Sequence, residues 1–131
     1  MAHDALATLF ARARDFDRAL AENQKVIDRI AVLVKDTPDS ERLSARQTIA
    51  LVDRAGLAVL RAEHTRRRAD WEFARDACRT ATVSVDANEA LKNSQGDSHD
   101  EATISLPAFV ARVDAALAGR PLPPLPPDEY R

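Results

Sequence analysis

Basic side chains gather between residues 61 and 79, around the single tryptophan of the chain. Guanidinium groups pair with phosphates and an indole ring can stack on a base, so this stretch has the chemistry of a nucleic-acid-binding face. The residues that would form the contacts are Arg66, Arg67, Arg68, Trp71 and Arg75. A small nucleic-acid-binding regulator that uses this helix face is therefore the alternative function.

Acidic residues interleave with these arginines and weaken that interpretation. They are Glu63, Asp70, Glu72 and Asp76, and they leave only a small positive excess over the stretch. Arg68 and Glu72 are four residues apart, which favours a local ion pair on one helix face. The whole chain has a formal net charge of −2, whereas dedicated nucleic-acid binders are normally strongly positive. A solvated charged face is the simpler prediction, and nucleic acid is not the expected partner.

Residues that could support catalysis or bind a metal are scattered. His3, His64 and His99 lack a second ligand at a spacing that places two ligands on one helix face. Cys78 is the only cysteine, and its place on the Trp71 face of a helix predicts a small buried hydrophobe. A single cysteine forms no intramolecular disulfide, which suits a reducing compartment. We predict a protein that is not an enzyme and has no cofactor and no metal.

The last twelve residues, 120–131, contain five of the seven prolines. Because proline fixes φ and supplies no backbone N–H, this tail should be extended, in the polyproline II form that peptide-binding domains recognise. Its basic-x-x-Pro-x-x-Pro spacing resembles a ligand of SH3 domains. The predicted partner-binding residues are Arg120, Leu122, Pro123, Leu125 and Pro126. The other interpretation is that both leucines fold back and hold the tail on its own domain.

Asn23 interrupts an apolar heptad pattern in the first predicted helix. One seam position holds Leu6, Ala13, Leu20, Ile27 and Val34, and the other holds Leu9, Phe16, Asn23 and Ile30. An amide at a seam position can hydrogen-bond its equivalent across a dimer axis, so we predict that Asn23 serves self-association in a homodimer. The alternative is a hydrated position at the edge of the seam.

Helices must position all of these residues. Apolar content is 45% and aromatic content is 5%, and the chain has only three glycines for tight turns. The sequence therefore predicts an all-α protein. We expect a helical bundle domain over residues 1–119, built on a long antiparallel helical hairpin plus two shorter helices, followed by the Pro-rich tail.

The predicted hairpin begins with a helix over residues 5–35, capped by Asp4. Thr37 should cap the second helix, with Pro38 at its first position. In that second helix Gly56 should allow a close approach of another helix.

The second half of the chain has weaker boundary signals. A break or kink is expected near residues 65–70, with Asp70 as the cap of a fresh helix; an unbroken helix is the alternative. Residues 93–100 have the composition of a loop. The last helix should begin at Ser105, carry Pro107 in its first turn and end at Gly119.

These patterns predict a non-enzymatic protein–protein interaction module, meaning an adaptor, assembly factor or chaperone-like protein. It would present a long helical face, together with the proline tail, to another protein. No apolar run approaches the ~20 residues that span a bilayer, and no secretory signal is visible at the N-terminus. We therefore expect a cytoplasmic protein without membrane contact. The excess of arginine over lysine is typical of a high-GC bacterial genome.

Overall fold

The computed structural model describes residues 15–37, 40–87 and 97–123, and the regular elements within these ranges are all helices. Helix α2 spans Phe16–Asp36, α3 spans Glu41–Thr65, α4 spans Arg68–Ala87 and α6 spans Asp97–Leu117. The prediction of an all-α protein is confirmed. The predicted cap Asp4 and the first ten residues of the predicted first helix lie outside the described residues.

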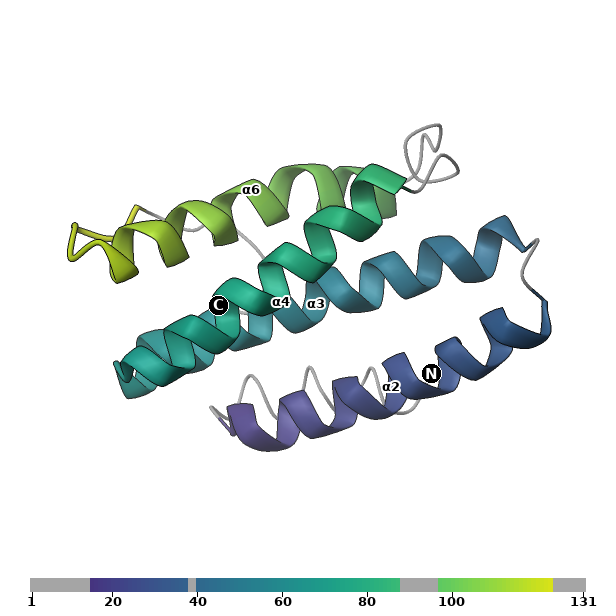
Figure 1. The fold of residues 1–131 in the computed structure, drawn as a ribbon, viewed down its shortest axis with the longest axis horizontal. Coiled ribbons are helices and arrows are strands. Elements are labelled where there is room, and N and C mark those ends of the chain that lie inside the picture. The colour runs from purple at the N-terminus through teal and green to yellow at the C-terminus, as the bar shows by residue number, and fades with distance from the viewer. Residues whose placement is uncertain (1–14, 38–39, 88–96, 124–131) are drawn as a thin grey trace.

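Helix α3 is the central element of the fold. It packs against α2 on one side and against α4 and α6 on the other, and α4 also contacts α6. In Figure 1, α2 and α3 lie side by side and run in opposite directions, α4 crosses α3, and α6 lies along the upper edge. Helices α3, α4 and α6 thus form a three-helix unit, to which α2 is added through α3.

The main core lies inside that three-helix unit and includes the first half of α2. Phe16, Trp71 and Phe109 supply its large side chains, each 8% exposed or less. Most of its remaining members are small, which lets the helix backbones approach closely. The buried alanines of this core are Ala19, Ala55, Ala58, Ala62, Ala74, Ala77 and Ala81.

Gly56 shows why a residue without a side chain stands in the middle of α3. A Cβ atom at this position would lie 2.9 Å from Cζ of Phe109 on α6. Real carbon contacts are not that short, so the ring occupies the space that any other residue would fill. The predicted close approach at Gly56 is therefore the approach of an aromatic ring rather than of a second backbone.

The junction between the first two helices differs from the predicted one. Helix α3 begins at Glu41, and the Ser40 hydroxyl accepts a hydrogen bond from the Leu43 N–H at 3.2 Å. Thr37 instead ends α2: both its N–H and its hydroxyl donate to the Leu33 carbonyl, at 3.0 and 2.7 Å. Serine is a somewhat better N-cap than threonine, and the Thr37 hydroxyl is already engaged. Pro38 lies outside the described residues.

The expected break in the chain lies between Thr65 and Arg68. Arg66 adopts a left-handed conformation with φ of 58°, which stops α3. Asp70 is not the cap of α4 as predicted, because the helix has already begun at Arg68. Thr65 shapes this turn: its hydroxyl accepts from the Arg67 N–H at 3.3 Å and donates to the Asp70 carboxylate at 2.5 Å.

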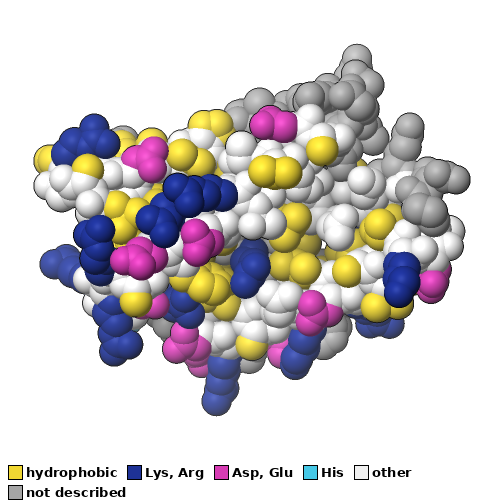
Figure 2. Space-filling model, viewed as in Figure 1, with side chains coloured by type: hydrophobic (Ala, Val, Ile, Leu, Met, Phe, Trp, Pro, Cys, Tyr) yellow, Lys and Arg dark blue, Asp and Glu magenta, His cyan; other side chains and the backbone are white. Residues whose placement is uncertain are grey.

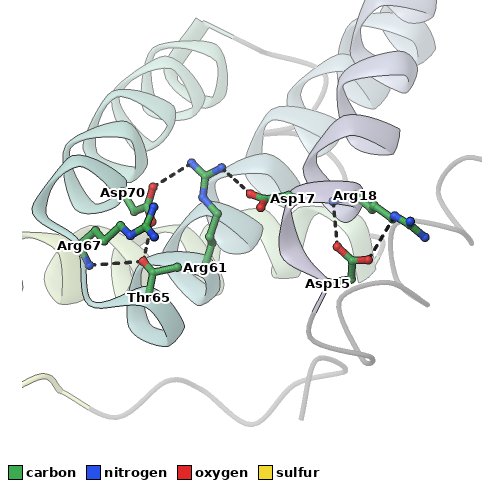
Figure 3. A network of polar contacts seen from close by, with 7 residues as sticks. All are labelled: Asp15, Asp17, Arg18, Arg61, Thr65, Arg67 and Asp70. Atoms are coloured by element: carbon green, nitrogen blue, oxygen red, sulfur yellow. Dashed lines mark hydrogen bonds and ion pairs between the residues drawn. The ribbon is translucent and has the colours of Figure 1, made fainter.

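Arg61 joins three helices at this same end of the molecule. From α3, its guanidinium lies 3.2 Å from the Asp17 carboxylate on α2 and 3.6 Å from the Asp70 carboxylate on α4. Figure 3 shows this network, with Thr65 and Arg67 beside Asp70. The guanidinium also lies 4.7 Å from the centre of the Phe73 ring. Because its side chain is only 19% exposed, the pairing satisfies a charge that would otherwise be costly to bury.

The last helix begins much earlier than predicted. Helix α6 starts at Asp97, so its first four residues fall in the segment predicted as a loop, and Ser105 is not its cap. Pro107 stands inside the helix and is exposed. It has no N–H to donate one turn back, so one helical hydrogen bond is missing there. The helix nevertheless continues through this exposed proline. The predicted end is confirmed: α6 stops at Leu117, and Gly119 has φ of 71°.

Candidate interaction surfaces

Two adjoining cavities lie between α4 and α6. The first has a volume of about 540 Å³ and the second about 420 Å³, and Thr82, Val110 and Asp114 line both. We call the combined depression the α4–α6 groove. From α4 it is lined by Arg75, Cys78, Arg79, Thr82, Val83, Val85 and Asp86; from α6 by Leu106, Pro107, Val110, Ala111, Val113 and Asp114.

The groove is apolar along its length and charged at its rim. Val83 is 68% exposed, which is unusual for a valine in a helix that packs on two others. Val110 opposite is half-buried, and Val113 is buried. Because α4 advances 1.5 Å per residue, the lining from Arg75 to Asp86 extends roughly 16 Å. This length corresponds to about three turns of a helix lying in the groove.

Charge is distributed unevenly along the groove. Arg75 and Arg79 lie toward the N-terminal part of α4, while Asp86 lies near its C-terminus. Asp114 from α6 lies on both cavities. Arg75 is 3.6 Å from the neighbouring Asp76 carboxylate, and Arg79 and Asp86 are exposed. One end of α4's rim is therefore basic and the other acidic.

The proline tail begins with a chain reversal. The Arg120 N–H donates to the Ala115 carbonyl at 2.8 Å and the Gly119 N–H to Ala116 at 3.2 Å, the pair of bonds that closes a Schellman motif. The reversed chain then brings the Pro123 carbonyl to the guanidinium of Arg112 on α6. Arg120 is exposed, and Leu122 is 40% exposed. The other two predicted tail residues, Leu125 and Pro126, lie outside the described residues.

The predicted basic cluster is divided by the fold. Arg66, Arg67 and Arg68 are exposed at the α3–α4 turn, and Arg68 pairs with Glu72 at 3.3 Å, which confirms that predicted ion pair. Trp71 is 8% exposed and belongs to the main core, so its ring packs on other helices. Arg75 lies further along α4, in the groove. Figure 2 shows basic and acidic side chains interspersed over the visible face rather than separated by sign.

Asn23 is placed inside the chain's own helix pair. It is 2% exposed, and its side-chain amide donates to the Ala50 carbonyl of α3 at 3.2 Å. This arrangement differs from both predictions, the dimer axis and the hydrated edge, because the neighbouring helix of the same chain covers the position. The amide is used to connect α2 with α3.

Cys78 is buried, as predicted. Burial, and then the charge of Asp114, raise the pKa of its thiol to about 12. The reactive thiolate is therefore rare at neutral pH. Within the described ranges, no three His, Cys, Asp or Glu side chains gather where they could hold a metal ion. In the same part of the chain no helix has the length and apolar character needed to cross a bilayer.

The α4–α6 groove escaped sequence reasoning. Val83 falls in the run Thr80–Val85, which is rich in β-branched residues and alternates briefly as a strand does, so it did not indicate a helix surface. A signal was present nonetheless, since Val83 does not fit the face defined by Trp71, Ala74 and Cys78.

Comparisons with protein-family models, with curated proteins and with solved structures give no match to this chain. The geometry of the surfaces above is thus the basis for a functional proposal.

Proposed function

We propose that this protein is a non-enzymatic protein–protein interaction module whose α4–α6 groove receives an amphipathic helix of a partner protein. The observation that carries this proposal is the pair of adjoining apolar cavities between two helices, with Val83 68% exposed at their edge. Helix-in-groove recognition uses a surface of this kind, in which apolar side chains of the partner fill the space between two helices.

The rim charges define the partner's chemistry. An acidic side chain of the incoming helix would lie opposite Arg75 and Arg79, and a basic one opposite Asp86. Rim charges of this kind contribute orientation and specificity more than affinity. Partner affinity would come from the apolar contacts with Val83, Val110 and their neighbours.

Binding rather than catalysis fits the groove's lining. The Cys78 thiol in this lining has a pKa of about 12 and stays protonated, and the Thr82 hydroxyl donates to the Cys78 carbonyl. The carboxylates of Asp86 and Asp114 lie among apolar groups without a histidine beside them in the lining. Such a lining offers shape and charge to a ligand.

The test uses a synthetic amphipathic helical peptide of about three to four turns. Its apolar face carries leucines, one end carries glutamates and the other lysines, and binding is followed by fluorescence anisotropy. Val83→Glu should weaken binding at least about tenfold, because it places a charge against the apolar face. Val32→Glu on α2 is the matched control, since Val32 is 62% exposed and lies away from the groove.

Equal effects of Val83→Glu and Val32→Glu would contradict the proposal. A peptide with its charged ends exchanged should bind more weakly to the wild-type chain, by about threefold for a rim pair of this exposure. Concentration-dependent oligomers that Val83→Glu abolishes would identify a second copy of the chain as the partner.

Nucleic acid is the alternative function, and it rests on the exposed Arg66, Arg67 and Arg68. A salt titration of DNA binding separates it from the groove proposal. Phosphate contacts release counterions, so affinity should fall steeply with salt and Arg66→Gln should reduce the slope. Absence of binding at low salt removes this alternative.

A further inference from the structure

A buried arginine stands where the proline tail first meets the domain. Arg112 on α6 is only 8% exposed, although arginine is seldom buried without a partner. One of its terminal nitrogens forms an ion pair with Glu63 on α3, and the other donates to the Pro123 carbonyl. The guanidinium therefore connects α6, α3 and the tail.

The carbonyl acceptors of the proline tail and the N–H donors of Arg112 are complementary. A proline-rich segment has few N–H groups and forms no internal hydrogen bonds, so its carbonyls are its main polar contacts. A guanidinium offers five N–H donors in a fixed fork. Because Glu63 balances the charge, Arg112 can remain buried while it donates to a neutral carbonyl.

The chain reversal at Gly119 places the tail beside the Arg112 guanidinium. The two bonds of the Schellman motif turn the chain back along α6, and Pro123 then reaches a residue eleven positions earlier in the sequence. Leu122 stays 40% exposed at the same point. The tail is thus held through the backbone carbonyl of Pro123. This contact does not depend on the predicted packing of Leu122 and Leu125 against the domain.

We propose that Arg112 and Glu63 form a binding site for a proline-rich segment, and that the chain's own residues 120–123 occupy it. The functional boundary of the domain then lies after Pro123 rather than after Gly119. The predicted recognition motif that begins at Arg120 has its central proline engaged with the domain. A partner that reads the whole motif must first displace Pro123 from Arg112.

The amide of Leu122 reports on this site, because it lies between two prolines that have no N–H. In ¹⁵N NMR relaxation of the full chain, its order parameter should be close to the value of about 0.85 of rigid backbone. Arg112→Lys keeps a positive charge beside Glu63 but lacks the planar fork of guanidinium N–H donors. This variant should lower the Leu122 order parameter below about 0.6. The Arg120 amide, held by the Ala115 carbonyl, should stay ordered in both chains.

Two further variants keep the test decisive. Arg29→Met removes an exposed arginine of α2 and should leave the Leu122 amide ordered. In Leu122→Ala the amide of residue 122 should also stay ordered. If the leucine side chain held the tail instead, this substitution would make that amide mobile. A mobile Leu122 amide in the wild-type chain overturns the proposal, as does an ordered one in Arg112→Lys. The wild-type and Leu122→Ala measurements decide it even if a variant at Arg112 does not fold.

Discussion

The two halves of helix α2 carry the same apolar period but have different surroundings. In the first half, Phe16, Ala19 and Leu20 belong to the main core, and the Phe16 ring meets the His64 ring edge-on at 5.7 Å. In the second half, Val26 and Ile30 form a separate small cluster with Ala50 of α3. Beyond it Val32 is 62% exposed and Leu33 is 40% exposed. A heptad pattern predicts which residues face a partner helix, but the size of the cluster that they join depends on whether further helices reach it.

Phe16→Ala should be the most disruptive change in α2. Removing a buried aromatic side chain from a core closed by several helices should lower the free energy of unfolding by about 3–5 kcal/mol. Urea denaturation followed by far-UV circular dichroism measures the loss, with Val32→Ala as the control. A loss no larger than that of the control would contradict the assignment of Phe16 to the main core.

Ile30→Ala tests the second half of the helix. Its cluster is small, and Ile27 and Val34 at its edge are only partly buried. The structure around the void can therefore relax, and we expect a loss of about 2 kcal/mol. Hydrogen exchange should show the change mainly in the C-terminal half of α2, as local opening. Uniform loss of protection across α3 and α4 would mean that the two clusters unfold as one.

Gly56→Ala tests how α6 closes the main core. The added methyl group meets the Phe109 ring, and the overpacking should outweigh the gain in helix propensity by about 1–2 kcal/mol. Phe109→Leu in the same chain should recover part of the loss, because it removes the ring atoms in contact. Greater stability of Gly56→Ala than of the wild-type chain would show that the ring moves aside at little cost.

Asn23 lies between the two halves of α2, and its replacement should have a smaller effect. Asn23→Ala removes the bond to the Ala50 carbonyl and should lower the free energy of unfolding by about 1 kcal/mol. Equilibrium sedimentation should give the same oligomer mass for this variant and the wild-type chain, because the bond is internal. A change in oligomer mass would contradict this and would support the predicted role of Asn23 at a dimer axis.

Cys78 should affect stability only at high pH. Its folded-state pKa of about 12 exceeds the ordinary thiol pKa of 9.0, so the folded chain keeps a proton that the unfolded chain loses. The contribution of the Cys78 thiol to the free energy of unfolding is therefore fully present below pH 9 and is lost as the pH rises toward 12. The stability difference between the wild-type chain and Cys78→Ala should narrow over that window. A constant difference would mean that the thiol is not shielded by the core.

Local signals predicted part of this fold. The break after Thr65 lies within the predicted range of residues 65–70, and Gly119 follows the end of α6 as predicted, because its positive φ suits a glycine. The predicted start of α6 was wrong, because the helix extends ten residues before Pro107 although this proline removes one helical hydrogen bond. Ser40 and Thr37 are both acceptable caps, with serine somewhat preferred, and the hydroxyl contacts of the folded chain show which one is used.

The candidate surfaces were harder to predict because they depend on pairs of helices. The sequence suggested that Trp71 was available for stacking, but it is buried in the main core. The α4–α6 groove requires Val83 and Val110 to lie opposite one another, and residues 27 positions apart in sequence carry no local sign of that contact. The contacts of Arg112 could not be predicted from local sequence either, because its partners Glu63 and Pro123 come from other elements of the fold.

A chemical-shift map of the helical peptide on the ¹⁵N-labelled chain tests the groove proposal most directly. The largest changes should lie on α4 and α6, at Val83, Val110 and their neighbours, and should disappear in Val83→Glu. The amides of Val32 and Leu33 on α2 should be unaffected. Changes centred on α2 or on Arg66–Arg68, or no changes at all, would contradict the assignment of the α4–α6 groove as the binding surface.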